Sequence, residues 1–210
     1  LAMPPAQAAA LLILPSLVTN VWQMRPWRTL PALVRRLGPM QVGVVVGTLA
    51  GAWWLGAPAG AWAEAALGVA LIAYGGRGLW GAQLPRVSDA AQRIAGPLVG
   101  AATGLVTAVT GVFVVPAVPY LQALGLARDE LVQAMGLAFT VSTVALAVGL
   151  ALNRQYPAAA AAGSALLVLP ALIGMQAGQW LRQRLSPARF KLCFMGALVL
   201  LGAWMVARAW

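Results

Sequence analysis

Small polar side chains gather at a few places in a chain of 210 residues that is otherwise strongly apolar. Hydroxyl and amide groups are neutral hydrogen-bond donors, and glycine lets the backbone approach a ligand closely. Residues of these types, spaced as they are, predict a pocket that binds a small anion without a charged side chain. The candidate site residues are Gly104, Thr107, Thr110, Gly111, Gln133, Thr140, Ser142, Thr143, Ser16, Thr19 and Asn20.

The counts of other chemical groups exclude several kinds of site. The chain has no histidine, a single cysteine (Cys193) and four acidic residues. This composition removes disulfide frameworks, metal sites that contain histidine and catalytic triads built on histidine. No two acidic residues lie together in the middle of an apolar stretch. We therefore expect no enzyme activity, no cofactor and no metal site.

The composition also predicts the elements that position these residues. Hydrophobic residues make up 61% of the chain and charged residues 9%, whereas soluble domains carry about 25% charged residues. We therefore predict an all-α, polytopic membrane protein. Charges divide the chain into apolar stretches near the length of a membrane helix. The predicted helices span residues 6–23, 38–56, 61–79, 131–152, 155–180 and 190–207.

A charge-free run from Ile94 to Ala127 is too long for one crossing and is interrupted by glycines and prolines. We predict two half-helices, at about 94–108 and 112–124, which form a re-entrant hairpin over 94–125. Irregular backbone is tolerated at membrane depth only where it is buried in protein or lines a cavity. A half-helix that begins near Gly111 would direct free N–H groups at an anion.

Basic residues cluster in three segments, 25–36, 77–93 and 182–191. The positive-inside rule predicts that these segments are cytoplasmic and that 57–60 and 153–156 are external. We expect a multi-pass protein of the inner membrane. The tryptophans fall near the predicted span ends, as in an interfacial belt. The net charge of +10 therefore reflects topology, and we expect the lipid bilayer as a partner but no nucleic acid.

The chain matches itself weakly, because Gly47–Trp53 resembles Gly174–Trp180. The charge rule gives the two halves opposite orientations, so we predict inverted repeats over 1–93 and 94–210. Such a repeat predicts a counterpart of 94–125 ahead of Leu1, and we interpret the chain as N-terminally truncated. Chance similarity among helices rich in alanine, glycine and leucine is the alternative explanation.

The segment from Gly100 to Gln122, followed by a helix rich in serine and threonine, resembles the sulfite exporter TauE/SafE family of membrane proteins. Gly100, Gly104, Gly111 and Pro116 match the pattern of that family, whereas Thr107, Val109 and Thr110 stand where glycines are commoner. The resemblance implies a secondary transporter for a small anion such as sulfite, a sulfonate or a related organic anion. It indicates neither the direction of transport nor the oligomeric state.

Other interpretations of the same residues remain open. The glycines at 43, 47, 51, 174 and 178 have the spacing of helix-packing positions, and we favour packing for them. A serine or threonine in a helix can bond the carbonyl four residues earlier. The charged residues 128–130 resemble a helix N-terminus more than a gate. The alternative function is a membrane accessory or assembly protein that does not transport.

Overall fold

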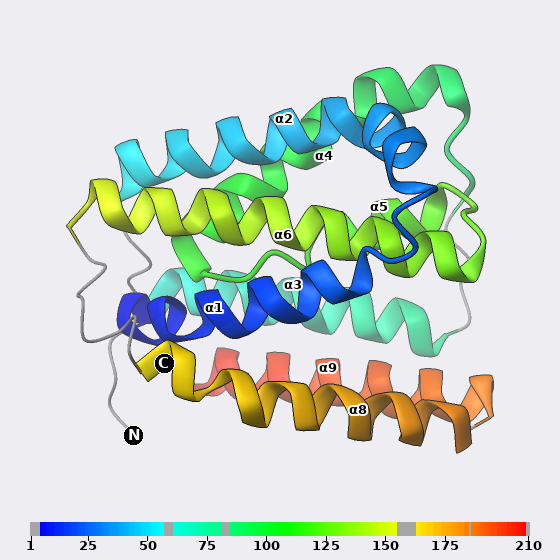
Figure 1. Cartoon of the computed structure of the whole chain (residues 1–210). Coiled ribbons are helices and arrows are strands. Elements are labelled where there is room, and N and C mark those ends of the chain that lie inside the picture. Colours follow the sequence, from blue (N-terminus) through cyan, green and yellow to red (C-terminus); the bar gives the residue numbers. More distant parts are fainter. Residues whose placement is uncertain (1–4, 57–60, 81–84, 155–162, 185, 209–210) are drawn as a thin grey trace. The chain divides into compact units, whose positions relative to one another are not determined.

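The computed structural model describes residues 5–56, 61–80, 85–154, 163–184 and 186–208. Those residues form helices and no strand, which confirms the all-α prediction (Figure 1). Three helical segments, Asp89–Thr110, Arg128–Leu152 and Gly163–Leu181, are long and apolar enough to cross a membrane. The helices are α1 Pro5–Gln23, α2 Leu30–Leu55, α3 Ala61–Leu79, α4 Asp89–Thr110, α5 Ala117–Ala123, α6 Arg128–Leu152, α8 Val168–Arg184 and α9 Pro187–Arg208.

Most helix boundaries agree with the predictions from charge and apolar length. Helices α1, α3, α6 and α9 lie within about three residues of their predicted ends. The backbone N–H of Ala127 donates to the Glu130 carboxylate at 3.2 Å, so the charged residues before α6 cap that helix as expected. Of the predicted helix 155–180, residues 155–162 lie outside the described residues, and the part from Gly163 onward is largely helical.

Helix α2 begins at Leu30, whereas the sequence predicted a start at residue 38. Apolar composition locates the stretch inside a bilayer, but a helix can continue beyond it into the polar interface. A proline in the first turn costs no intrahelical hydrogen bond, so Pro31 is compatible with the earlier start. The correction makes α2 the longest described helix, at 26 residues.

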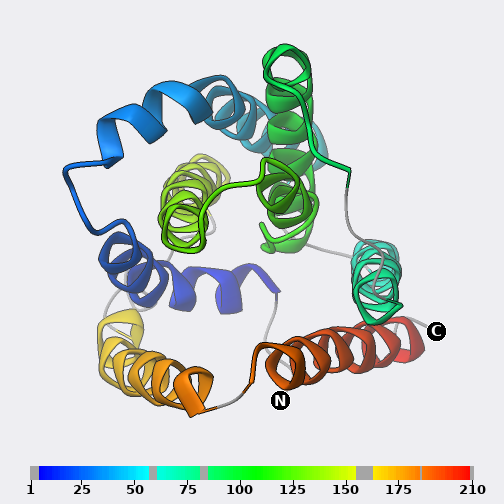
Figure 2. The ribbon, with the colours of Figure 1, turned by 90° about the vertical axis from the view of Figure 1, so that its right-hand side faces the viewer.

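The chain divides into two compact units. Unit 1 comprises Leu1–Ala59 and Pro85–Ala171, and unit 2 comprises Gly60–Leu84 and Leu172–Trp210. Within unit 1, α6 packs against α1, α2, α4 and α5, as the view along the helices shows (Figure 2). Unit 1 therefore contains every residue of the predicted site.

Helices α2 and α4 are in backbone contact along a seam of glycines. A Cβ atom added at Gly47 would overlap the carbonyl of Ala101, and one added at Gly104 would overlap the carbonyl of Val44. Gly43 and Gly100 make equally close approaches to the opposite helix. The packing interpretation is thus confirmed for the α2 glycines, and Gly104 belongs to the same seam.

Contacts within unit 1 fix the helix directions. Gly100 lies against Met40 and Gly104 against Val44, so α2 and α4 run in the same direction. Buried residues near the starts of α2 and α6 share one core cluster, and Gly149 lies against Ala52 near their ends, so these helices are also parallel. Helix α1 runs antiparallel to α6, because the amide of Gln133 donates to the carbonyl of Met24, just after α1 ends.

These directions gather arginines at one end of unit 1, which we call the basic end. It includes Arg36, whose guanidinium lies 3.8 Å from the carboxylate of Asp89 and donates to Gln92 at 3.1 Å. The predicted cytoplasmic segment 25–36 therefore meets residues 85–93 of the predicted cytoplasmic segment 77–93. At the opposite end, the Asn153 side chain donates to the carbonyl of Ala52 at 3.1 Å. The two ends thus differ in charge, as the topology prediction requires.

Large apolar side chains remain exposed on the described helices, as expected where lipid covers them. Exposed tryptophans lie near helix ends, and Trp53 and Trp80 are 83% and 90% exposed. The guanidinium of Arg25 lies 4.2 Å from the ring centre of Trp22, and that of Arg184 lies 4.0 Å from Trp180. Such pairs suit a membrane interface, because the ring is apolar and the cation remains wet.

Unit 2 pairs α3 with α9 in antiparallel orientation. Gly68 and Gly202 approach each other so closely that a Cβ atom on either would meet the carbonyl of the other. Gly75 packs against the carbonyl of Met195 in the same way. Gly174 and Gly178 of α8 meet no described atom at their Cβ positions. The packing predicted for these two glycines is therefore not found within the described residues.

Candidate functional site

The interruption after α4 lies where the threonines and glycines predicted it. Helix α4 ends at Thr110, and Gly111 adopts a left-handed conformation with φ 72°. Its N–H donates to the carbonyl of Thr107 at 2.8 Å, which closes the last turn of the helix. Glycine suits this position because it has no Cβ atom to clash at positive φ.

The helices on either side of the interruption, α4 and α5, differ more in length than the sequence predicted. Helix α4 spans Asp89–Thr110 rather than 94–108, and α5 spans only Ala117–Ala123 rather than 112–124. Ser88 caps α4 by accepting the N–H of Ala91, which starts the helix before its apolar run. The β-branched residues and Pro116 that follow Gly111 disfavour helix, so α5 starts late.

The orientation of the helix end at Gly111 reverses one prediction. Gly111 caps the C-terminus of α4, so the helix ends there rather than begins. The C-terminal end of a helix carries partial negative charge from its last carbonyls. The prediction of a half-helix that directs free N–H groups from Gly111 at an anion was therefore wrong.

The interrupted segment returns to the end from which it started. The N–H of Val87 donates to the carbonyl of Ala123 at 3.0 Å, which joins the residue before α4 to the end of α5. Residues 87–123 therefore form a loop whose two ends meet at the basic end of unit 1. Its crossing of only part of a bilayer remains a prediction.

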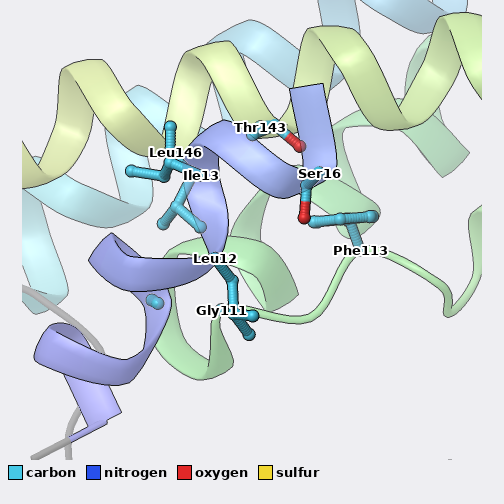
Figure 3. Close-up of a pocket in the computed structure, with 8 residues that line it drawn as sticks. Leu12, Ile13, Ser16, Gly111, Phe113, Thr143 and Leu146 are labelled. Carbon is cyan, nitrogen blue, oxygen red and sulfur yellow. The ribbon is translucent and has the colours of Figure 1, made fainter. Parts of the chain in front are cut away.

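Helix α1 is distorted opposite this interruption. Pro15 has no N–H and removes one intrahelical hydrogen bond. The N–H of Leu14 donates to the hydroxyl of Ser164 at 3.1 Å, so a side chain from elsewhere in unit 1 enters the hydrogen-bond pattern of α1. Inserted side chains and prolines are the usual causes of helix kinks. Figure 3 shows α1 changing direction along this stretch.

A cavity of about 100 Å³ lies between the distorted helix, the interrupted segment and α6 (Figure 3). Three of the predicted residues, Ser16, Gly111 and Thr143, line it. The rest of the lining is apolar and was not predicted; it consists of Ala9, Leu12, Ile13, Phe113 and Leu146. Apolar residues at helical spacing are typical of any core, so the sequence carried no signal for them.

All five predicted threonines donate a hydrogen bond within their own helix. Thr107, Thr110, Thr140 and Thr143 donate to the carbonyl four residues earlier at 2.7 Å each, and Thr19 does so at 2.9 Å. The hydroxyl of Thr110 also accepts the N–H of Val112 at 3.1 Å, which fixes the turn after α4. No hydrogen bond joins the Ser16 hydroxyl to another described residue. Ser16 is therefore the cavity donor that a ligand can use most readily.

The remaining predicted residues lie away from the cavity. Gly104 belongs to the α2–α4 seam. Gln133 donates to the carbonyls of Met24 and Pro26 at 2.7 Å each and accepts the Thr29 hydroxyl at 2.9 Å, so it fixes the turn between α1 and α2. Asn20 and Ser142 are buried, and the side-chain nitrogen of Asn20 has no partner among the described residues.

Comparison with known proteins identifies a family. The family model described as sulfite exporter TauE/SafE matches residues 1–205. No curated protein and no solved structure matches the chain significantly. The matched range includes α1, α6 and the interrupted segment, and therefore the whole lining of the cavity.

Proposed function

The chain belongs to the sulfite exporter TauE/SafE family, and we propose from this premise that it is a secondary transporter for a small oxyanion, sulfite or an organic sulfonate. It acts as a multi-pass protein of the inner membrane, with the basic end of unit 1 in the cytoplasm. The family match carries this proposal, and the position and lining of the cavity support it.

The position of the cavity supports transport. It lies between two interruptions of regular helix, at Pro15 in α1 and at Gly111 after α4. Secondary transporters commonly bind substrate where discontinuous helices meet. A cavity of about 100 Å³ has room for a small solute.

The chemistry of the lining supports weak, reversible binding. No charged side chain is among the lining residues, and the C-terminal end of α4 disfavours an anion there. The Ser16 hydroxyl offers a neutral donor, and Gly111 permits close approach of the backbone. Arginines at the basic end raise the local anion concentration. The ligand is thus attracted at the surface and held loosely inside.

The packing of α1 on α6 supports the predicted inverted repeats, 1–93 and 94–210. In the predicted repeats α1 corresponds to α6, and these two helices pack antiparallel. Ser16 and Thr143 then face the cavity from equivalent helices. Relative movement of the two repeats would expose the cavity alternately to each side.

The test is sulfite flux in proteoliposomes that contain the purified full chain. Ser16→Leu fills the cavity and removes its free hydroxyl, so we expect flux to fall at least tenfold. Thr19→Val is the matched control, because Thr19 lies one turn later in α1 and bonds its own helix. We expect Thr19→Val to retain flux within about twofold. Normal flux in Ser16→Leu, with the control equally normal, would remove the cavity from the transport path.

A further inference from the structure

Two buried polar side chains of α2 have no hydrogen-bond partner among the described residues. Gln41 is 8% exposed, and neither its amide nitrogen nor its amide oxygen is bonded. Thr48 is fully buried, and its hydroxyl is unbonded as well. Buried polar groups in proteins are nearly always paired, so each exception calls for an explanation.

These two residues lie on one face of α2. Gln41, Thr48 and Ala52 are spaced by seven and four residues, which places them on the same side of a helix. Ala52 faces α6, because it packs against Gly149 and its carbonyl accepts a hydrogen bond from Asn153. Gln41 and Thr48 therefore face the contact between α2 and α6, which we call the α2–α6 seam.

The matching face of α6 is small and contains one hydroxyl. Because the two helices are parallel and Ala52 lies opposite Gly149, Thr48 falls opposite Ala145, and Gln41 falls opposite Ala138. Ser142 shares this face and lies between the other two levels, buried to 1% exposure. Three polar side chains thus lie on a seam that also includes Ala52 and Gly149.

A second buried glutamine in the same unit shows what a structural role requires. The amide of Gln133 donates to two backbone carbonyls and accepts one hydroxyl. Gln41 has none of these bonds to described residues. Burial of an unbonded amide costs free energy and does not stabilise the fold. Gln41 therefore has no role in folding that its contacts explain.

We propose that Gln41, Thr48 and Ser142 form a second, elongated binding site for the transported oxyanion along the α2–α6 seam, which extends from the level of the cavity toward the cytoplasmic side. Ala138 precedes Thr143 by five residues, so the Gln41 level lies about 8 Å nearer the basic end than the cavity does. The amide supplies two N–H donors and the hydroxyls supply two more, all neutral. The α2–α6 seam opens during transport, and the anion passes this site between the basic end and the cavity.

This inference rests on the proposed function, and one pair of variants tests it. Gln41→Leu removes the donors and the unbonded amide together. We expect sulfite flux in proteoliposomes to fall at least tenfold, with the melting temperature in detergent unchanged or raised. Gln133→Leu is the matched control and should lower the melting temperature, because it leaves bonded backbone groups without partners. Normal flux in Gln41→Leu, or a melting temperature that falls as in the control, would overturn the second site.

Cysteine labelling tests the same site without any measurement of flux. In a Cys193→Ala background, we expect Gln41→Cys and Thr48→Cys to react with a small water-soluble methanethiosulfonate at least tenfold faster than Val44→Cys. Val44 is the control because it is fully buried on the same helix but faces α4. Equal, slow labelling at all three positions means that the seam never opens to water, which overturns the proposal. Absence of sulfite flux in the unsubstituted chain contradicts the proposed function instead, so the two failures are distinguishable.

Discussion

Two regions of unit 1 use glycine in opposite ways. Along the α2–α4 seam, Gly47 and Gly104 bring the two backbones into contact and leave no space for a side chain. At the cavity, Gly111 ends a helix, and its Cβ position meets only the methyl group of Ala9 at 3.4 Å. The first region is rigid because regular helices interlock. The second retains space because regular helix is interrupted.

This difference in packing predicts a structural role for the α2–α4 seam and a role in transport for the cavity. Two regular helices in backbone contact cannot shift gradually past each other, since a small displacement meets steric overlap. Interrupted segments have fewer intrahelical bonds to lose and change conformation at lower cost. We therefore expect substitutions in the α2–α4 seam to act on stability and substitutions at the cavity to act on transport.

The largest expected effect is on stability, from Gly104→Ala. The new methyl group would overlap the carbonyl of Val44, so α2 and α4 must separate. Overpacking of this kind costs about 1–3 kcal/mol in the free energy of unfolding, and sometimes more. The control is Gly76→Ala in α3, where no described atom lies within 4 Å of the Cβ position. That change should instead stabilise by about 0.5–1 kcal/mol. Reversible unfolding in detergent measures both, and equal effects would refute the contrast.

How much of this contrast the sequence could predict depends on the kind of signal. Small residues four apart identified the α2 side of the rigid seam, and the glycine–threonine run located the interruption. The direction of the helix end at Gly111 was also available, because glycine commonly follows the last turn of a helix and proline follows soon after.

The partners of the polar residues could not be predicted. Gln133 and Gln41 are both lone glutamines in apolar helices, yet one is fully bonded and the other is not. Only the register between helices decides this, and register depends on three-dimensional packing rather than on local pattern. For the same reason, Ser142 and Thr143 are neighbours in sequence but face different helices, with Thr143 at the cavity.

The second expected effect combines strain with loss of transport, in Gly111→Ala. A residue with a Cβ atom at φ 72° is strained by about 1–2 kcal/mol. We expect the free energy of unfolding to fall by that amount and sulfite flux to fall at least tenfold. Gly111→Asn separates the two effects, since asparagine tolerates this conformation better but places its side chain at the cavity. A stable Gly111→Asn protein with full flux would show that the cavity is not used.

The third expected effect is smaller and falls on the turn that shapes the cavity. Thr110→Val removes a hydroxyl that donates to the carbonyl of Val106 and accepts the N–H of Val112. Only the second bond fixes the turn, so we expect a loss of about 0.5–1.5 kcal/mol in the free energy of unfolding. Thr140→Val is the control, because its hydroxyl bonds only its own helix. Equal destabilisation of the two variants would mean that the turn after α4 needs no side-chain support.

The smallest expected effect is that of a charge at the basic end. Arg36 pairs with Asp89, whose side chain is 97% exposed, so Arg36→Gln should change stability by less than about 1 kcal/mol. Arg36 lies outside the cavity, so it should affect transport only by attracting the anion electrostatically from a distance. Attraction of this kind is screened by salt within about 10 Å at 0.1 M. We therefore expect sulfite flux to fall by less than about threefold at low ionic strength and to equal that of the unsubstituted chain near 0.5 M salt.

Arg154→Gln is the control for this prediction. Arg154 lies at the opposite end, so the change should leave initial flux from the cytoplasmic side unchanged. A salt-independent loss in Arg36→Gln would instead place a charged group in direct contact with the anion.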